Sequence, residues 1–454
     1  MGSYGGNLLV RGGLLILPHR RPFRGDVRVV DGRVEEIGRS LSRGAAEEVI
    51  DAEGMIVMPG VVDEHVHMRE PGLEYKDDFT HGTMGAAVAG VTTVLEMPNT
   101  KPPVENSSIL KRKAELLSSK AYVDFGLYGV IHNSNVHEFE DMVSEGAVGF
   151  KIFLGPTTGN IPPPDDGSLY EAMLKSAKLG VTLAFHAENA DLVKYFTRRV
   201  KASGRADPAA HEAARPPICE EEAIQKLILF SRRTGGHAHI VHMSAKEGVE
   251  LLRRARCEGV RVTGETCPHY LLLSSKDYAR YGTAIKVNPP IRGEEHRRAL
   301  WEAVLDGTIT ALGSDHAPHS SEEKRGNVWE CAAGFTGVQT FLPLMIHQAL
   351  NGRLPLSRIP ELMSEAPAKL FRIWPRKGSL QVGADGDLVV IDPQGETIIT
   401  RDWLKAKHPI TPFLGWRLKG RVKYVVLRGV VVAKDYELLV KKPAGLWVRP
   451  SRLT

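Results

Sequence analysis

The sequence predicts an α/β protein: a (β/α)8 barrel of the TIM type with a small β-sandwich domain assembled from both chain termini. Apolar strand-like segments alternate with amphipathic stretches through the middle of the chain, and short strands without such helices occupy both ends. The length of 454 residues also exceeds the ~250 residues of a single barrel. We place the composite β domain at residues 1–57 and 376–454, and the barrel at residues 58–375.

The two ends of the chain carry strand signals. Residues Asp26–Ile37 alternate on both sides of Asp31-Gly32, which is typical of a hairpin because glycine supplies the positive φ of a tight turn. Because neither end has enough strands for a stable sheet, we expect the two ends to pair. Further strand-like runs lie at Leu8–Val10, Leu14–Leu17, Asp387–Ile391, Val422–Leu427 and Val430–Ala433.

Between these ends, eight apolar segments predict the barrel strands. They are Val57–His67, Val91–Met97, Tyr122–Val130, Val148–Leu154, Val181–His186, Ala238–Met243, Gly259–Thr266 and Ile309–Asp315. The stretches between them favour helices, for example Glu220–Arg232 and Ala245–Cys257. Residues Gly155–Gly167 hold too much Gly and Pro for regular structure, which predicts a mobile active-site loop.

Composition excludes several classes of function. A net charge of +5 with interspersed signs is too mild for a nucleic-acid binder. Four scattered cysteines form neither a disulfide framework nor a zinc-finger pattern. The uncharged, largely apolar run Gly82–Leu95 is shorter than the ~18 residues of a membrane helix, and we expect no signal peptide. We therefore expect a cytoplasmic protein without nucleic-acid or membrane partners.

Polar residues interrupt the predicted strands at their carboxyl ends. His65 and His67 are two residues apart on an extended segment, so both side chains face the same side. Their expected neighbours from other strands are Lys151, His186, His242 and Asp315. Imidazole and carboxylate suit zinc, manganese, iron or cobalt, and a neutral buried lysine can take up CO2 to form a carbamate that bridges two metals. Singly, a histidine at a strand end is more often a core residue, and Lys151 could pair with a carboxylate.

Taken together, these motifs resemble the cyclic amidohydrolases, the dihydroorotase, allantoinase and hydantoinase branch of the amidohydrolase superfamily. The segments that carry the resemblance are Val62–Gly72, Gly149–Lys151, His186–Asn189, His239–Ser244, Gly264–Tyr270, Ser314–His319 and Pro412–Trp416. The resemblance implies that His65, His67 and Asp315 hold one Zn²⁺ and that His186 and His242 hold the other. It also implies that N6-carboxylated Lys151 and a hydroxide bridge the two metals, with Asp315 as general acid and base.

The residues outside the metal set favour dihydroorotase, which hydrolyses dihydroorotate reversibly to N-carbamoyl-aspartate in pyrimidine biosynthesis. Arg69, Asn99 and His319 match residues with which dihydroorotases hold the carboxylate of this small anionic cyclic amide. Asn288 is expected to hydrogen-bond the ring. A purely structural alternative pairs Arg69 with Glu70 or Asp77 and makes Asn99 a turn cap.

Two alternatives remain open at this stage. Allantoinase or hydantoinase shares the chemistry, and the run Gly264–Tyr270 and the chain length also resemble allantoinase. A non-catalytic scaffold is the second alternative, although such relatives usually lack several ligands. Many long bacterial dihydroorotases have Asp-Asp-Gly where this chain has Lys151, so the role of Asp165 and Asp166 is open. Metal identity, homo-oligomer formation and association with a carbamoyltransferase are open too.

Overall fold

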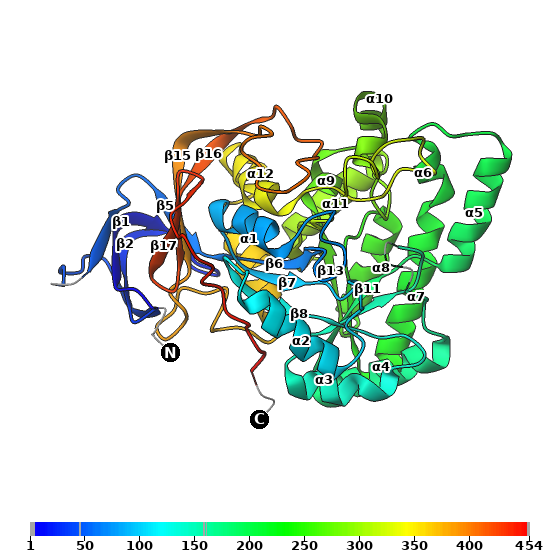
Figure 1. The fold of residues 1–454 in the computed structure, drawn as a ribbon, viewed down its shortest axis with the longest axis horizontal. Helices are drawn as coiled ribbons and strands as arrows, with labels where there is room; N and C mark the ends of the chain where they lie inside the picture. Colours follow the sequence, from blue (N-terminus) through cyan, green and yellow to red (C-terminus); the bar gives the residue numbers. More distant parts are fainter. Residues whose placement is uncertain (1–4, 45–46, 158, 160, 452–454) are drawn as a thin grey trace.

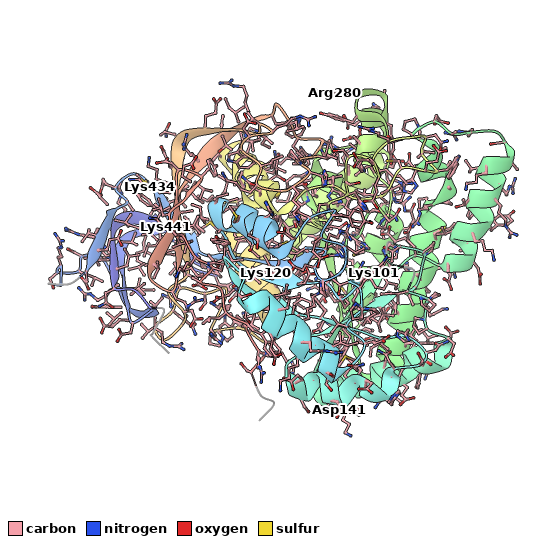
Figure 2. The ribbon with its side chains drawn as sticks, in the orientation of Figure 1. Lys101, Lys120, Asp141, Arg280, Lys434 and Lys441 are labelled. Atoms are coloured by element: carbon pink, nitrogen blue, oxygen red, sulfur yellow. The ribbon has the colours of Figure 1, made fainter. Side chains whose placement is uncertain are left out.

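The computed structural model describes residues 5–44, 47–157, 159 and 161–451. A sheet made of strands from both ends of the chain lies beside a barrel of parallel strands wrapped by helices (Figure 1). The predicted fold class is confirmed. Exposed charged side chains such as Asp141, Arg280 and Lys434 project from the periphery of both parts (Figure 2). Among the described residues, no helix combines the length and apolarity needed to cross a bilayer.

The sheet that joins the two ends of the chain is one continuous hydrogen-bonded path. Its strands follow the order β18-β17-β16-β15-β5-β1-β2-β3, with β4 paired to β1. Strand β5 is the junction, because it pairs in parallel with β1 and antiparallel with β15. The bounds are β1 (Leu8–Leu15), β2 (Phe23–Val30), β3 (Arg33–Gly38), β4 (Glu48–Asp51), β5 (Ile56–Pro59), β15 (Leu388–Ile398), β16 (Arg417–Leu427), β17 (Val430–Lys434) and β18 (Glu437–Leu438).

The hairpin expected at Asp31-Gly32 joins β2 to β3. Asp31 has φ 48° and Gly32 has φ 78°. A two-residue turn with positive φ at both central positions matches the right-handed twist of the flanking strands. The sequence signal for this turn is therefore confirmed at the level of the backbone.

The barrel strands surround a packed interior. They are β6 (Val61–Val66), β7 (Val91–Glu96), β8 (Asp124–Leu127), β9 (Gly129–Val130), β10 (Phe150–Phe153), β11 (Thr182–His186), β12 (His237–Ile240), β13 (Val262–Thr266) and β14 (Ala311–Leu312). Strands β8 and β9 share the third position, and a parallel bridge between Val66 and His316 joins β6 to the chain after β14. Each of the predicted segments thus contains a barrel strand.

One predicted strand is wrong in its extent. The run Val57–His67 is two strands, because β5 belongs to the terminal sheet, where Pro59 pairs with Leu388, and β6 begins the barrel. The chain changes direction at Gly60, where a Cβ atom would lie 2.2 Å from Oγ1 of Thr92. Only glycine fits this close approach, and a continuous apolar run hides it from pattern analysis.

Helices follow most barrel strands. Their bounds are α1 (Phe79–Val88), α2 (Ser107–Ser118), α3 (Phe139–Glu145), α4 (Asp166–Leu179), α5 (Ala190–Ala202), α6 (Ala210–Ala214), α7 (Pro217–Thr234), α8 (Lys246–Cys257), α9 (Pro268–Leu272), α10 (Tyr278–Tyr281), α11 (Glu294–Asp306), α12 (Val338–Leu350), α13 (Arg358–Pro360) and α14 (Ala366–Leu370). Short 3₁₀ turns lie at Val136–Glu138, Ser275–Asp277 and Gly282–Ile285, with a π-helical turn at Glu361–Glu365.

The aspartates of the predicted active-site loop serve helix α4. Asp165 is the N-cap, and its side chain accepts a hydrogen bond from the backbone N–H of Ser168 at 2.8 Å. Asp166 lies 3.0 Å from Nζ of Lys226 on the outside of the barrel. Both carboxylates are therefore engaged away from the barrel mouth, and capping explains why they occur at this position.

A buried cluster of charges joins the barrel to the terminal sheet. Nζ of Lys377 lies 2.7 Å from Asp387 and 2.9 Å from Asp385, and it also contacts Asp124 at the start of β8. Arg428, at the end of β16, pairs with the same Asp124. Burial alone would lower the pKa of Lys377, but the three carboxylates raise it above its ordinary value. This cluster is the polar link between the two parts of the fold.

We expect Lys377→Met to lower the thermal stability strongly. Removing the only lysine of the cluster leaves buried carboxylates short of positive charge, which typically costs about 3–5 kcal/mol. The measurement is the melting temperature by calorimetry. Arg417→Met is the matched control, because Arg417 pairs with Glu396 on the exposed surface of the same sheet and such pairs contribute little. Equal melting temperatures for the two variants would contradict this role of Lys377.

Candidate metal centre

A pocket opens at the carboxyl ends of the barrel strands. Active sites in this fold lie at that end, because the loops after the strands meet there. The lining residues are His65, His67, Arg69, Asn99, Lys151, Phe153, Thr157, His186, His242, Asn288, Asp315, Ala317, Ala333 and Gly334. Every residue that the sequence analysis singled out lines this pocket, with the exception of His319.

One group of candidate ligands comes from the two ends of the barrel sequence. His65 and His67 stand at the end of β6, and Asp315 follows β14. Oδ1 of Asp315 lies 3.4 Å from Nε2 of His65 and 3.5 Å from Nε2 of His67. Burial alone would raise the pKa of Asp315, but the two histidines lower it below its ordinary value. A carboxylate and two imidazoles thus face one point.

A second group stands beside the first. Nδ1 of His186, at the end of β11, lies 3.0 Å from Nε2 of His242, which follows β12. The ring centroids of His65 and His242 are 5.3 Å apart, so the two groups are contiguous. Burial lowers the pKa values of both His186 and His242, which keeps their imidazoles neutral, the form that binds metals.

Partners behind the first group fix which nitrogen faces the pocket. Nδ1 of His65 donates to Oε1 of Glu265 at 3.0 Å, and Nδ1 of His67 donates to Oδ1 of Asn99 at 2.8 Å. Burial also lowers the pKa of His67 to about 3, so its ring is neutral. Each Nε2 therefore keeps its lone pair, as metal-binding histidines in proteins do.

The second group has a comparable support. Nε2 of His186 lies 2.9 Å from Oε2 of Glu188, which leaves Nδ1 of His186 facing His242. Glu188 also pairs with Arg215. Burial alone would raise the pKa of Glu188, but Arg215 and His186 lower it to about 2. Glu188 is therefore a charged carboxylate held beside the ring of His186, whose Nε2 makes no hydrogen bond among the described residues.

Lys151, on β10, lines the same pocket and is close enough to Asp315 and His242 to interact with both electrostatically. Its side chain is 1% exposed, and within the described part of the chain its Nζ has no hydrogen-bond partner. Burial lowers the pKa of Lys151 to about 8. Nε2 of His65 is likewise buried without a hydrogen bond among the described residues. Buried polar atoms without partners are rare, and a set of imidazoles and a carboxylate around them fits divalent cations of the zinc type.

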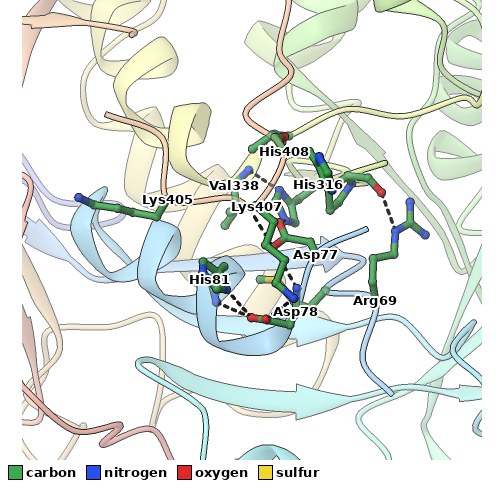
Figure 3. A network of polar contacts seen from close by, with 12 residues as sticks. Arg69, Asp77, Asp78, His81, His316, Val338, Lys405, Lys407 and His408 are labelled. Atoms are coloured by element: carbon green, nitrogen blue, oxygen red, sulfur yellow. Dashed lines mark hydrogen bonds and ion pairs between the residues drawn. The ribbon is translucent and has the colours of Figure 1, made fainter. Parts of the chain in front are cut away.

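The expected carboxylate-binding residues are held by the protein itself. Nε of Arg69 donates to the carbonyl oxygen of Pro318 at 3.0 Å (Figure 3), and its Nη2 lies 3.3 Å from Nε2 of His319. His319 is outside the pocket, 3.1 Å from Glu323 and 3.3 Å from Lys76. His319 therefore contacts Arg69 from outside the pocket.

Asn99 and Asn288 differ in what they contact. Asn99 accepts the hydrogen bond from His67 described above, so it orients a candidate ligand. Oδ1 of Asn288 lines the pocket and, among the described residues, is buried without a hydrogen-bond partner. Asn288 is therefore the better placed of the two to accept a hydrogen bond from a small molecule.

Several supporting residues escaped the sequence analysis. Glu265 and Glu188 lie in the quoted motifs, and the signal that could have found Glu188 is a carboxylate two residues after a strand-end histidine. Residues 399–411, between β15 and the Pro412–Trp416 motif, gave no signal. There Lys407 reaches Asp78, with Nζ 2.6 Å from Oδ2, and so holds the loop that carries Arg69 (Figure 3).

Comparison with known proteins gives concordant matches. A model of the amidohydrolase family matches residues 56–432. An allantoinase of Rubrobacter xylanophilus is 39% identical over 455 residues, which is 98% of this chain and 98% of that protein. An L-hydantoinase of Paenarthrobacter aurescens is 39% identical over 429 residues, 93% and 94% of the two chains. The solved structure of an L-hydantoinase (dihydropyrimidinase) from Arthrobacter aurescens superposes with a TM-score of 0.95 at 37% identity, covering 98% and 100%.

The expectation of dihydroorotase activity is wrong. Relatives that match nearly the whole chain are named allantoinase and L-hydantoinase, so the alternative fits better. In the structure the three residues do not form one carboxylate-binding group, because His319 lies outside the pocket and Oδ1 of Asn99 accepts a hydrogen bond from His67. The expected role in pyrimidine biosynthesis and the expected association with a carbamoyltransferase depended on dihydroorotase activity, so they have no support either.

We expect His65→Ala to weaken zinc binding by on the order of 100-fold or more, because loss of a supporting residue alone costs about 10- to 100-fold. The measurement is titration of the metal-stripped protein with zinc by calorimetry. His81→Ala is the control, because His81 belongs to a separate group with Asp77 and Asp78 that could also hold a metal. Loss of zinc binding in His81→Ala alone would move the metal centre to that group.

Proposed function

The chain belongs to the amidohydrolase family and is a cyclic amide hydrolase, and we propose that it opens a hydantoin ring, with allantoin, a ureido-substituted hydantoin, as the preferred substrate. Water adds across the ring amide: its oxygen bonds to the carbonyl carbon, the C–N bond breaks, and the released nitrogen gains a proton. The product is a carboxylic acid that carries an open urea group, and it ionises to the carboxylate by releasing its proton to the solvent.

One observation of the site carries the proposal. Six side chains from the ends of five barrel strands line one small pocket: His65, His67, Lys151, His186, His242 and Asp315. The name of the full-length relative from Rubrobacter xylanophilus supports the choice of substrate.

We propose that these side chains hold two zinc ions. His65, His67 and Asp315 would hold one ion, His186 and His242 the other, and Lys151, carboxylated on its amine, would bridge them. When bound, such a pair lowers the pKa of water and polarises the ring carbonyl. The lowered pKa of Lys151, caused by burial, favours the neutral amine that carboxylation by CO2 requires.

Asp315 is the proposed general base and acid. Its pKa, lowered by His65 and His67, keeps it ionised, so it can accept a proton from the attacking water. The same carboxyl group then gives this proton to the ring nitrogen as the C–N bond breaks. Asp315 thus carries one proton from the water to the ring nitrogen, and the reaction needs no covalent enzyme intermediate.

The remaining pocket residues bind and orient the ring. Asn288, whose Oδ1 has no partner among the described residues, would accept a hydrogen bond from a ring N–H. Arg69, held by Pro318 and His319, would donate to a carbonyl oxygen of the substrate. Asn99 would act through His67. These neutral and donor groups suit an uncharged ring that carries several N–H and C=O groups.

A substrate panel tests the proposal. Purified protein loaded with zinc in the presence of bicarbonate is offered allantoin, 5-substituted L- and D-hydantoins, dihydrouracil and dihydroorotate. We expect the highest kcat/KM with allantoin, measured by release of the ring-opened acid. Turnover of L-hydantoins without allantoin would favour the second candidate, an L-hydantoinase, which the relative from Paenarthrobacter aurescens supports. Turnover of dihydrouracil alone would contradict both.

Lys151→Ala tests the bridge. We expect loss of the metal pair and of activity, because the carboxylated amine is absent, and partial recovery of both when a small carboxylic acid such as acetate or propionate is added. The measurements are metal content by mass spectrometry and hydrolysis rate. Full metal content and activity in Lys151→Ala without added acid would refute the bridging role.

A further inference from the structure

A line of contacts runs from a candidate metal ligand to the wall of the pocket. Nε2 of His186 lies 2.9 Å from Oε2 of Glu188, and the same oxygen accepts from Nη1 of Arg215. The other terminal nitrogen of Arg215, Nη2, donates to the carbonyl oxygen of Pro156 at 2.9 Å. Thr157, the next residue, lines the pocket. The guanidinium of Arg215 therefore contacts both Glu188, beside His186, and Pro156, next to the pocket-lining Thr157.

Arg215 itself is firmly held. It ends helix α6, is 8% exposed, and its carbonyl oxygen accepts from Nη1 of Arg292 at 2.8 Å. Nε of Arg292 donates to Oγ of Ser244 at 2.8 Å, just after the strand end that carries His242. Arg292, which holds the backbone of Arg215, is therefore itself bonded to a residue at the barrel mouth.

The residues after β10 pack directly against the backbone of His186 and Glu188. A Cβ atom at Gly155 would lie 2.4 Å from the carbonyl oxygen of Glu188. The N–H of Leu154 donates to the carbonyl oxygen of His186 at 3.0 Å. The first residues after β10 therefore follow the backbone of His186 and Glu188, and the Arg215–Pro156 hydrogen bond holds the segment where these contacts end.

We propose that Arg215 is a positioning residue that couples the pocket wall at Pro156 and Thr157 to the orientation of His186 through Glu188. Its two terminal nitrogens have separate tasks. Nη1 neutralises Glu188, which holds this carboxylate beside Nε2 of His186 and leaves Nδ1 of His186 facing His242. Nη2 fixes the wall against which a ring substituent would pack. The kinetic part of this inference rests on the proposed hydrolysis of allantoin.

The separate tasks predict that two substitutions differ. Arg215→Lys keeps a cation beside Glu188, but one ammonium group cannot reproduce the planar fork that reaches both partners. Arg215→Met removes both interactions and leaves the buried carboxylate of Glu188 without its cation. Arg199→Met on α5 is the control, because Arg199 is exposed and its side chain, among the described residues, donates to the hydroxyl of Tyr195 alone.

The experiment has three readouts. Zinc retained after dialysis against a chelator reports the orientation of His186. Hydrogen–deuterium exchange of the peptide that covers residues 150–161 reports the wall. Steady-state kinetics with allantoin report KM and kcat. The first two need no turnover, so they test the coupling even if the proposed substrate is wrong.

We expect Arg215→Lys to retain zinc within twofold of the unmodified protein, to exchange faster in the peptide, and to raise KM on the order of tenfold with a smaller change in kcat. Arg215→Met should in addition lose zinc at least tenfold more readily. Arg199→Met should match the unmodified protein in all three. Unchanged exchange in Arg215→Lys, or unchanged zinc retention in a folded Arg215→Met, would overturn the proposal.

Discussion

The burial of polar side chains at the barrel mouth is the constraint on which the site depends. Imidazole, carboxylate and amine groups that leave water must find partners, or they destabilise the fold. Three of the candidate ligand histidines have a polar partner on the ring nitrogen that faces away from the pocket. Glu265 contacts His65, Asn99 contacts His67, and Glu188 contacts His186. His65 and Lys151, whose Nε2 and Nζ make no hydrogen bond among the described residues, line the same pocket as Asp315, where a cation can bind.

The same site stores backbone strain. Arg69, His242 and Asp315 have φ values of 67°, 43° and 46°, a region that residues with a side chain rarely adopt. Such conformations cost about 1–3 kcal/mol each and persist only where surrounding contacts hold them. The bridge of Val66 to His316 and the bonds of Arg69 to Pro318 are contacts of this kind. The strained backbone that orients these three side chains therefore lowers the stability of the barrel.

Patterns with a short period could be predicted from the sequence, and contacts between distant segments could not. Alternating apolar runs indicated the barrel strands, and the spacing of His65 and His67 indicated a shared face. The break at Gly60 lay hidden in a continuous apolar run, and the link of Lys407 to Asp78 joins segments that no periodicity connects. The error about Arg69 and His319 has the same origin, because spacing shows where a side chain starts and not which partner it meets.

The composite sheet has a consequence for how the chain is made. Strand β5 lies between β1 and β15, so its second neighbour is synthesised only after the whole barrel. Until Leu388 and the following residues emerge from the ribosome, the N-terminal strands expose an unpaired edge, which is a template for association with other chains. The buried charges around Lys377 cannot assemble earlier either, since Asp387 and Arg428 arrive last. The nascent polypeptide thus completes its first-made sheet last, and this interval is where chaperones would be needed most.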